Sequence, residues 1–149
     1  MIFGLQDAEE TGALRARAQS RCFVCGPDHP NGLHIAYRMS SDGTTTALWT
    51  PDSNCEGFRG IVHGGIVSTV LDEAMSKAVA ASGCEALTGE LRVRLRRRVA
   101  PGEVLSIRGW VTGRKKRLIE TEATLTDGSG AERAHAWASF LTLREEKTK

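Results

Sequence analysis

Residues 60–75, GIVHGGIVSTVLDEAM, place a histidine, two glycines and two adjacent acids in a segment that otherwise favours a helix. Glycine in a helix costs up to about 1 kcal/mol of helix propensity per residue. That cost at Gly64 and Gly65 is explained if a ligand must approach the backbone closely. A helix N-terminus also carries partial positive charge, which suits a carbonyl oxygen that becomes an oxyanion. A tight loop-to-helix turn is the alternative explanation.

The two acids of this segment differ in their neighbours along the helix that we expect over residues 64–81. Apolar residues recur there every three or four positions and form one apolar stripe. Glu73 has Lys77 four residues later, so a modest surface ion pair explains it. Asp72 has only serines four residues away on either side, and aspartate is unfavourable in the middle of a helix. We therefore favour Asp72 as the functional carboxylate.

The segments around the helix predict the scaffold that must position these groups. Alternating or apolar stretches bounded by turn residues predict strands at 32–40, 44–51, 88–99, 103–113, 117–126 and 131–143. The order is then β-β-α-β-β-β-β, an α+β fold with one long helix against one antiparallel sheet. We expect a single domain over residues 1–149, with a leader at 1–20 that is weakly helical over residues 5–20.

Composition limits the classes of protein to consider. The chain has 149 residues, 40% hydrophobic residues and a net charge of +2, which is ordinary for a globular domain. No apolar run is long enough to span a membrane, and the N-terminus lacks the layout of a secretory signal. Four cysteines without such a signal favour reduced thiols. We therefore expect a cytoplasmic protein that does not bind membranes.

The sequence EGFRGIVHGGIVSTVLDEAM resembles the signature of hotdog-fold acyl-CoA thioesterases, in the branch of the phenylacetate-pathway (PaaI) enzymes. That signature has a His-Gly-Gly turn that enters the central helix and an acid nine positions after the histidine, here His63 and Asp72. The resemblance extends to CFVCG and NGL within residues 22–33 and to TGELRVRLRRRVAPGE at 88–103. It implies a hotdog fold, in which an antiparallel sheet wraps one long central helix.

The resemblance also implies a reaction, the hydrolysis of acyl-CoA to a free acid and coenzyme A, for which we expect no cofactor. The Gly65 N–H would polarise the thioester carbonyl, with Gly64 beside it at the substrate. Asp72 would act as general base on water or attack the carbonyl directly. His63 would orient the loop or the carbonyl. Thr88 corresponds to a hydroxyl residue that positions water, although strict alternation turns it away unless Gly89 allows a bulge.

Two basic clusters are candidates to meet the phosphates of coenzyme A, because guanidinium groups bind phosphate in a bidentate manner. A solvated outer face of the sheet is the alternative for any single arginine. Nucleic-acid binding is disfavoured, because interleaved aromatic residues are missing and the isoelectric point is near 8.5. The candidate phosphate ligands are Arg94, Arg96, Arg97 and Arg98 after the helix, and Arg114, Lys115 and Lys116 in a later turn.

The segment CFVCGPDHPNGLH offers four possible zinc ligands, Cys22, Cys25, His29 and His34. A structural zinc site usually has a second well-spaced pair and a compact knuckle. We therefore expect no metal site and interpret the cysteine pair as part of a packed N-terminal segment. We expect His135 and Trp137, on a strand rich in alanine, to lie in the core or at a subunit contact.

The length of the helix has a consequence for assembly. Gly64 and Asp72 are eight residues apart, or about 12 Å along a helix axis, too far for one small thioester to contact both. A symmetric homodimer with antiparallel helices would place the glycines of one chain beside the aspartate of the other, and such dimers could pair further. A hotdog module that binds acyl-CoA without catalysis is the alternative function. A hotdog hydratase would need a different arrangement of histidine and acid.

Overall fold

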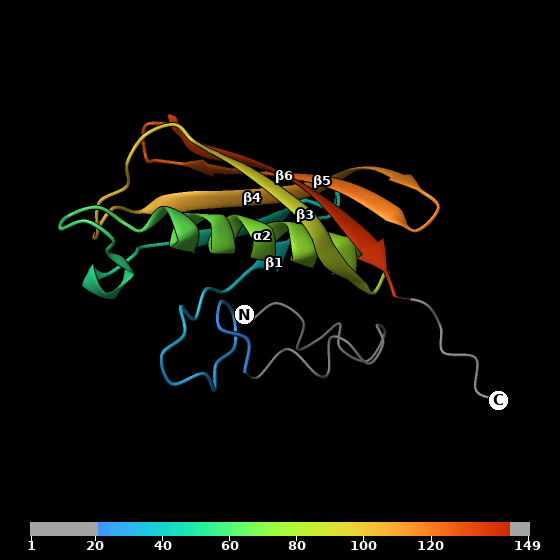
Figure 1. The fold of residues 1–149 in the computed structure, drawn as a ribbon, viewed down its shortest axis with the longest axis horizontal. Helices are drawn as coiled ribbons and strands as arrows, with labels where there is room; N and C mark the ends of the chain where they lie inside the picture. The colour runs from blue at the N-terminus through green and yellow to red at the C-terminus, as the bar shows by residue number, and fades with distance from the viewer. Residues whose placement is uncertain (1–20, 144–149) are drawn as a thin grey trace.

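The computed structural model describes residues 21–143, and the leader helix expected over 5–20 lies outside them. The helix and the strands run in the order predicted from the sequence (Figure 1). Their bounds are β1 Arg38–Met39, β2 Thr45–Trp49, α2 Gly64–Ala81, β3 Ala86–Leu95, β4 Leu105–Lys115, β5 Leu118–Thr126 and β6 Glu132–Thr142, with a short 3₁₀ helix, η1, at Ser53–Cys55. The strands form one six-stranded antiparallel sheet in the order β1-β2-β4-β5-β6-β3.

The sheet wraps α2, which confirms the predicted hotdog arrangement (Figure 1). Alternate residues of β4, β5 and β6 point toward the helix and are buried, among them Ile107, Leu125 and Phe140. Gly109 on β4 lets the helix approach closely, because a Cβ atom there would lie 2.7 Å from the backbone of Ala74. The core therefore fixes the position of α2 against the middle of the sheet.

Residues 21–37, the described part of the N-terminal segment, lie on the side of α2 that faces away from the sheet (Figure 1). Tyr37 is fully buried, and its hydroxyl donates to the Val70 carbonyl at 2.9 Å. The strand predicted at 32–40 is reduced to the two residues of β1. This part of the prediction was wrong because the amides of Leu33 and Ile35 bond to the carbonyls of Phe23 and Val24 instead of to a sheet neighbour.

The two edges of the sheet differ in length. At one edge, β1 has only two residues, whereas β3 at the other edge has ten. Leu91 and Leu95 of β3 are 38% and 53% exposed, because β3 is an edge strand and no further strand among residues 21–143 pairs with its outer side. A long edge strand with exposed leucines is an unpaired surface that proteins normally cover.

The outer face of the sheet carries His135 and Trp137, so a core position is wrong for them, and a subunit contact stays a prediction. Both side chains are half-buried and stack with ring centroids 4.3 Å apart. They point outward because the alternating alanines of β6 take the inner face. No helix in the described part of the chain is long and apolar enough to cross a membrane.

Candidate active site

A histidine caps the N-terminal end of α2. His63 is the N-cap residue, and its Nδ1 accepts a hydrogen bond from the Gly65 N–H at 2.9 Å. A Cβ atom on Gly65 would lie 2.9 Å from the same ring nitrogen, and one on Gly64 would lie 2.7 Å from Leu95. The contact with the His63 ring therefore explains glycine at position 65, whereas the contact at Gly64 is with the end of an exposed leucine side chain that can move.

Asp72 lies on the side of α2 that faces β3. Its Oδ1 accepts a hydrogen bond from the Thr88 hydroxyl at 2.8 Å. The register of β3 against β6 shifts between Thr88 and Glu90, so the bulge that this orientation of Thr88 required is present at Gly89. Burial raises the pKa of Asp72, the hydrogen bond from Thr88 opposes the rise, and the nearby Glu73 charge adds to it.

Glu73 forms the predicted ion pair with Lys77, but the pair is largely buried. Its Oε1 lies 3.6 Å from Lys77 Nζ, with side-chain exposures of 17% for Glu73 and 9% for Lys77. The predicted pairing is confirmed, but the predicted surface position was wrong, because the segment with Cys22 covers this side of the helix and places Cys22 Sγ 3.7 Å from the same carboxylate oxygen. Burial raises the pKa of Glu73 above its ordinary value, and Lys77 opposes the rise.

Two adjoining cavities lie beside the start of α2. One, of about 260 Å³, has Gly64, Leu95 and residues 96–99 among its lining residues. The other, of about 680 Å³, lies next to it and shares Arg97 and Arg98. Neither cavity is lined by Asp72 or Thr88.

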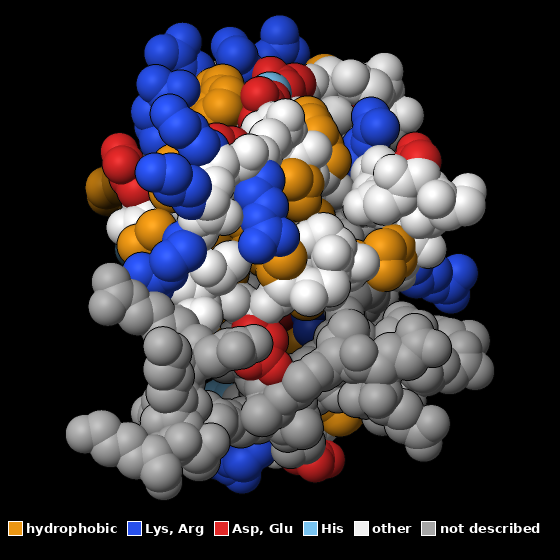
Figure 2. Space-filling view, turned by 90° about the vertical axis from the view of Figure 1, so that its right-hand side faces the viewer, with side chains coloured by type: hydrophobic (Ala, Val, Ile, Leu, Met, Phe, Trp, Pro, Cys, Tyr) orange, Lys and Arg blue, Asp and Glu red, His pale blue; other side chains and the backbone are white. Residues whose placement is uncertain are grey.

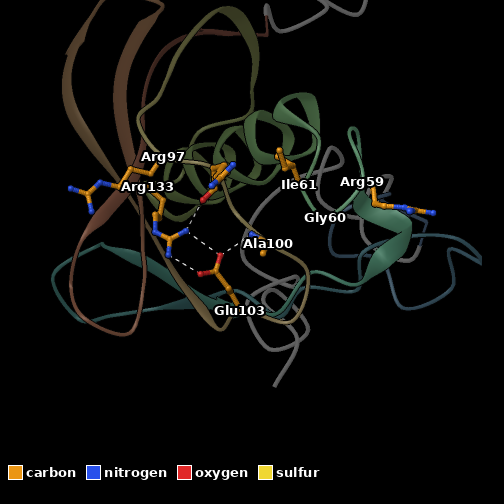
Figure 3. Close-up of a pocket in the computed structure, with 8 residues that line it drawn as sticks. Arg59, Gly60, Ile61, Arg97, Ala100, Glu103 and Arg133 are labelled. Carbon is orange, nitrogen blue, oxygen red and sulfur yellow. Dashed lines mark hydrogen bonds and ion pairs between the residues drawn. The ribbon is translucent and has the colours of Figure 1, made fainter.

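The larger cavity is rich in arginine. Figure 3 shows Arg59 and Arg97 on opposite sides of it, with their guanidinium groups extended outward. Between them, Arg133 is held by Glu103 at 2.7 Å and by the Arg98 carbonyl at 2.7 Å. Arg59 lies within the sequence EGFRGIVHGGIVSTVLDEAM but has no basic neighbours, so clustering of charge does not reveal it.

Of the remaining predicted phosphate ligands, Arg96 lines the smaller cavity, and the others lie on other parts of the surface. Arg96 is bound to Glu132 at 2.6 Å, and Arg94 is exposed on β3. Arg114 donates to Cys84 Sγ at 2.8 Å, just beyond the C-terminal end of α2, and Lys115 and Lys116 follow at the same turn. On the side of the molecule in Figure 2, Lys and Arg side chains gather along one margin. The two predicted clusters therefore lie near opposite ends of the helix.

The four candidate zinc ligands do not come together. His34 bonds to the His29 carbonyl at 2.6 Å, and the His29 ring packs edge-on against Phe23. Cys22 and Cys25 instead turn toward the helix, where Cys25 is buried in the predicted packed segment. Their sulfur atoms and a Glu73 carboxylate oxygen all lie within 4.8 Å of one another.

Comparisons with known proteins agree with this architecture. Residues 59–134, about half of the chain, match the family model of the thioesterase superfamily. No curated protein matches the chain significantly. A crystallised thioesterase superfamily protein superimposes with a TM-score of 0.80 at 23% identity, over 91% of this chain and 75% of the other.

Two further solved structures are similar. The PaaI protein from the E. coli phenylacetic acid degradation operon has a TM-score of 0.70 and 16% identity, over 75% of this chain and 81% of that one. A Streptococcus mutans UA159 protein bound to acetyl CoA has a TM-score of 0.70 and 18% identity, over 76% of this chain and 91% of its own. The chain belongs to the thioesterase superfamily and has its hotdog fold.

Proposed function

We propose that this protein hydrolyses acyl-CoA thioesters, with Asp72 as the residue that acts on the carbonyl carbon or on the attacking water. The observation that carries the proposal is the Asp72 carboxylate, partly buried and held by Thr88 at 2.8 Å, on a superfamily fold. The solved relatives include one bound to acetyl CoA and one with coenzyme A, which supports this class of substrate.

The carboxylate has the properties that the chemistry requires. A general base works best with a pKa near the operating pH, and burial moves the pKa of Asp72 upward in that direction. The hydrogen bond from Thr88 holds one carboxylate oxygen and so orients the other. Direct attack would form a mixed anhydride on Asp72, whereas base catalysis would not. Single-turnover hydrolysis in ¹⁸O water would label Asp72 only by the direct route.

The helix start supplies the electrophilic half of the site in this proposal. The N–H groups of Gly64 and Gly65 lie at the positive end of the helix dipole, where a developing oxyanion is stabilised. The Gly65 N–H is bonded to His63 in the free protein, so the carbonyl oxygen would replace the imidazole nitrogen as its acceptor. His63 would thus hold the donor in place until substrate binds.

The Asp72 carboxylate and the N–H groups at the helix start can belong to one site only if two chains contribute to it. They are about 12 Å apart along one helix, and neither cavity at the helix start is lined by Asp72. Pairing of two β3 edges in a homodimer would cover Leu91 and Leu95 and run the two helices antiparallel. The Gly65 of one chain would then face the Asp72 of its partner. A dimer of dimers is compatible with this arrangement.

The arginine-lined cavity is the proposed place for the coenzyme A phosphates. It adjoins the cavity at the helix start, and Arg59, Arg97 and Arg98 are exposed there. Two adjoining cavities allow the pantetheine arm to run from the helix start to the arginines. The turn with Arg114, Lys115 and Lys116 is the second candidate, since a partner chain could bring it near the same substrate.

Release of free thiol from a panel of short, medium, long and aryl acyl-CoAs tests the proposal. We expect turnover of at least one member, and loss of this turnover in Asp72→Asn. Binding of acyl-CoA by calorimetry with no release of thiol from any member would overturn the proposal in favour of the non-catalytic acyl-CoA-binding module.

A further inference from the structure

Although the sequence predicted no metal site, we propose that Cys22, Cys25 and Glu73 form a zinc site that fastens residues 21–37 to the central helix. The two cysteines lie in one turn, closed by a hydrogen bond from the Gly26 N–H to the Cys22 carbonyl at 2.8 Å. Glu73 comes from α2, 51 residues after Cys22 in the chain. Two distant segments therefore direct two thiols and a carboxylate to one point.

The spacing of the three ligand atoms suits a tetrahedral zinc ion. Zinc–sulfur bonds of about 2.3 Å and zinc–oxygen bonds of about 2.0 Å place a sulfur and an oxygen about 3.5 Å apart, and two sulfurs about 3.8 Å apart. Cys22 Sγ and Glu73 Oε1 lie 3.7 Å apart, and all three atoms lie within 4.8 Å of one another. Movements of about 1 Å or less would complete the geometry, and water would take the fourth position.

The charges around the cluster also balance. Two thiolates and one carboxylate carry three negative charges, and a zinc ion supplies two positive ones. The Lys77 ammonium, 3.6 Å from Glu73 and almost buried, supplies the third. A neutral ensemble is favourable here, because an uncompensated charge in a poorly solvated place is costly. Lys77, which the sequence predicted to pair with Glu73 at the surface, would thus neutralise the remaining charge of the zinc site.

The ligand set selects among metals. Thiolates bind zinc and other thiophilic ions, whereas magnesium and calcium prefer oxygen ligands. A disulfide between the cysteines would use neither Glu73 nor Lys77, whereas zinc uses the carboxylate as a ligand. The convergence of all three groups therefore favours the metal over a disulfide.

Titration of the reduced full-length protein with Co²⁺, followed by displacement with Zn²⁺, tests the site without reference to activity. We expect one equivalent of Co²⁺ to give a thiolate charge-transfer band and the intense visible bands of a tetrahedral ion. Zinc should abolish both and raise the melting temperature. Cys22→Ser and Cys25→Ser should each weaken binding by about 100-fold or more, and Glu73→Gln by about tenfold or more.

Matched controls use side chains of the same types outside the cluster. Cys84→Ser, His29→Ala and His34→Ala should leave the affinity for Co²⁺ unchanged. The zinc site is overturned if the folded, reduced wild-type protein gives no thiolate band, or if the band survives loss of both Cys22 and Cys25. Formation of a Cys22–Cys25 disulfide with oxidised glutathione, in a protein that binds no Co²⁺ when reduced, would assign the pair to thiol redox chemistry instead.

Discussion

Asp72 and Glu73 are neighbours in sequence, yet the two sides of α2 give them different surroundings. Asp72 faces the edge strand β3, where Thr88 donates one hydrogen bond to it. Glu73 faces the N-terminal segment, where Lys77 and Cys22 lie within 4 Å of its carboxylate. Burial raises the pKa of both acids. The difference therefore lies in access, since only Asp72 lies beside a strand edge that a second chain can reach.

The comparison shows that burial by itself does not identify a catalytic carboxylate. Glu73 has a charged partner, Lys77, and is covered by the segment with Cys22, which suits a structural role. Asp72 has the Thr88 hydroxyl, which orients its carboxylate and suits a catalytic role. Substitutions that remove one charge without changing shape should separate the two roles.

Activity should show the largest contrast. We expect Asp72→Asn to lower kcat by at least about 100-fold, because the carboxylate that acts in the transition state is lost. Glu73→Gln should lower kcat by less than about tenfold. Both are measured as thiol release from the best acyl-CoA at saturation. A larger loss in Glu73→Gln than in Asp72→Asn would reverse the assignment.

Stability should show the contrast in the opposite direction. Glu73→Gln removes the carboxylate beside the almost buried Lys77 ammonium, so we expect the free energy of unfolding to fall by about 2 kcal/mol. Asp72→Asn removes a partly buried charge and should leave stability unchanged or slightly higher. Urea denaturation at neutral pH measures both. Equal losses in the two variants would mean that the two sides of the helix do not differ in this way.

The KM for acyl-CoA should show which of the two basic clusters, at the start or at the C-terminal end of α2, binds the coenzyme phosphates. Replacing Arg59 and Arg97 together with glutamine should raise KM for acyl-CoA about tenfold while changing KM for an acyl-pantetheine less than about twofold, because only acyl-CoA carries the nucleotide phosphates. The matched control replaces Lys115 and Lys116 with glutamine. If only this control raises KM for acyl-CoA more than KM for the acyl-pantetheine, the phosphates bind at the turn and not in the cavity.

The smallest expected effect is a shift in the pH dependence of kcat/KM. Substitutions at two neighbours of Asp72 should shift it in opposite directions. Activity requires the carboxylate, so kcat/KM should fall as pH drops through the raised pKa of Asp72. Glu73→Gln removes a charge that raises this pKa and should move the acid limb to lower pH. Thr88→Val removes a hydrogen bond that lowers the pKa and should move the limb to higher pH. Shifts in the same direction would contradict this view of the site.

A linked effect of the same pKa shift should appear in stability. Because the folded state holds the Asp72 proton more tightly than the unfolded state, its contribution to stability is present below the ordinary pKa of aspartate. It is lost as pH rises through the raised pKa. Asp72→Asn should therefore flatten the fall of the unfolding free energy across this range, as measured by urea denaturation at several pH values.

The sequence predicted the features that depend on local pattern. The helix, five of the six strands and the isolation of Asp72 from a helical ion pair follow from spacing within a few residues. The burial of Glu73 and Lys77 could not be predicted in this way, because the segment that covers them is about 50 residues away in the chain. The His63 cap and the place of Arg59 depend on how the loop before α2 folds.

Subunit complementation tests most directly the central claim that one site needs the Asp72 side of one helix and the start of another. Gly65→Pro removes the proposed N–H donor at a position in the first helical turn, and Asp72→Asn removes the carboxylate. Each variant by itself should be inactive. After exchange in an equal mixture, half of the dimers are mixed and half of their sites are intact, so about a quarter of wild-type activity should return. No recovery after demonstrated exchange would contradict the shared site.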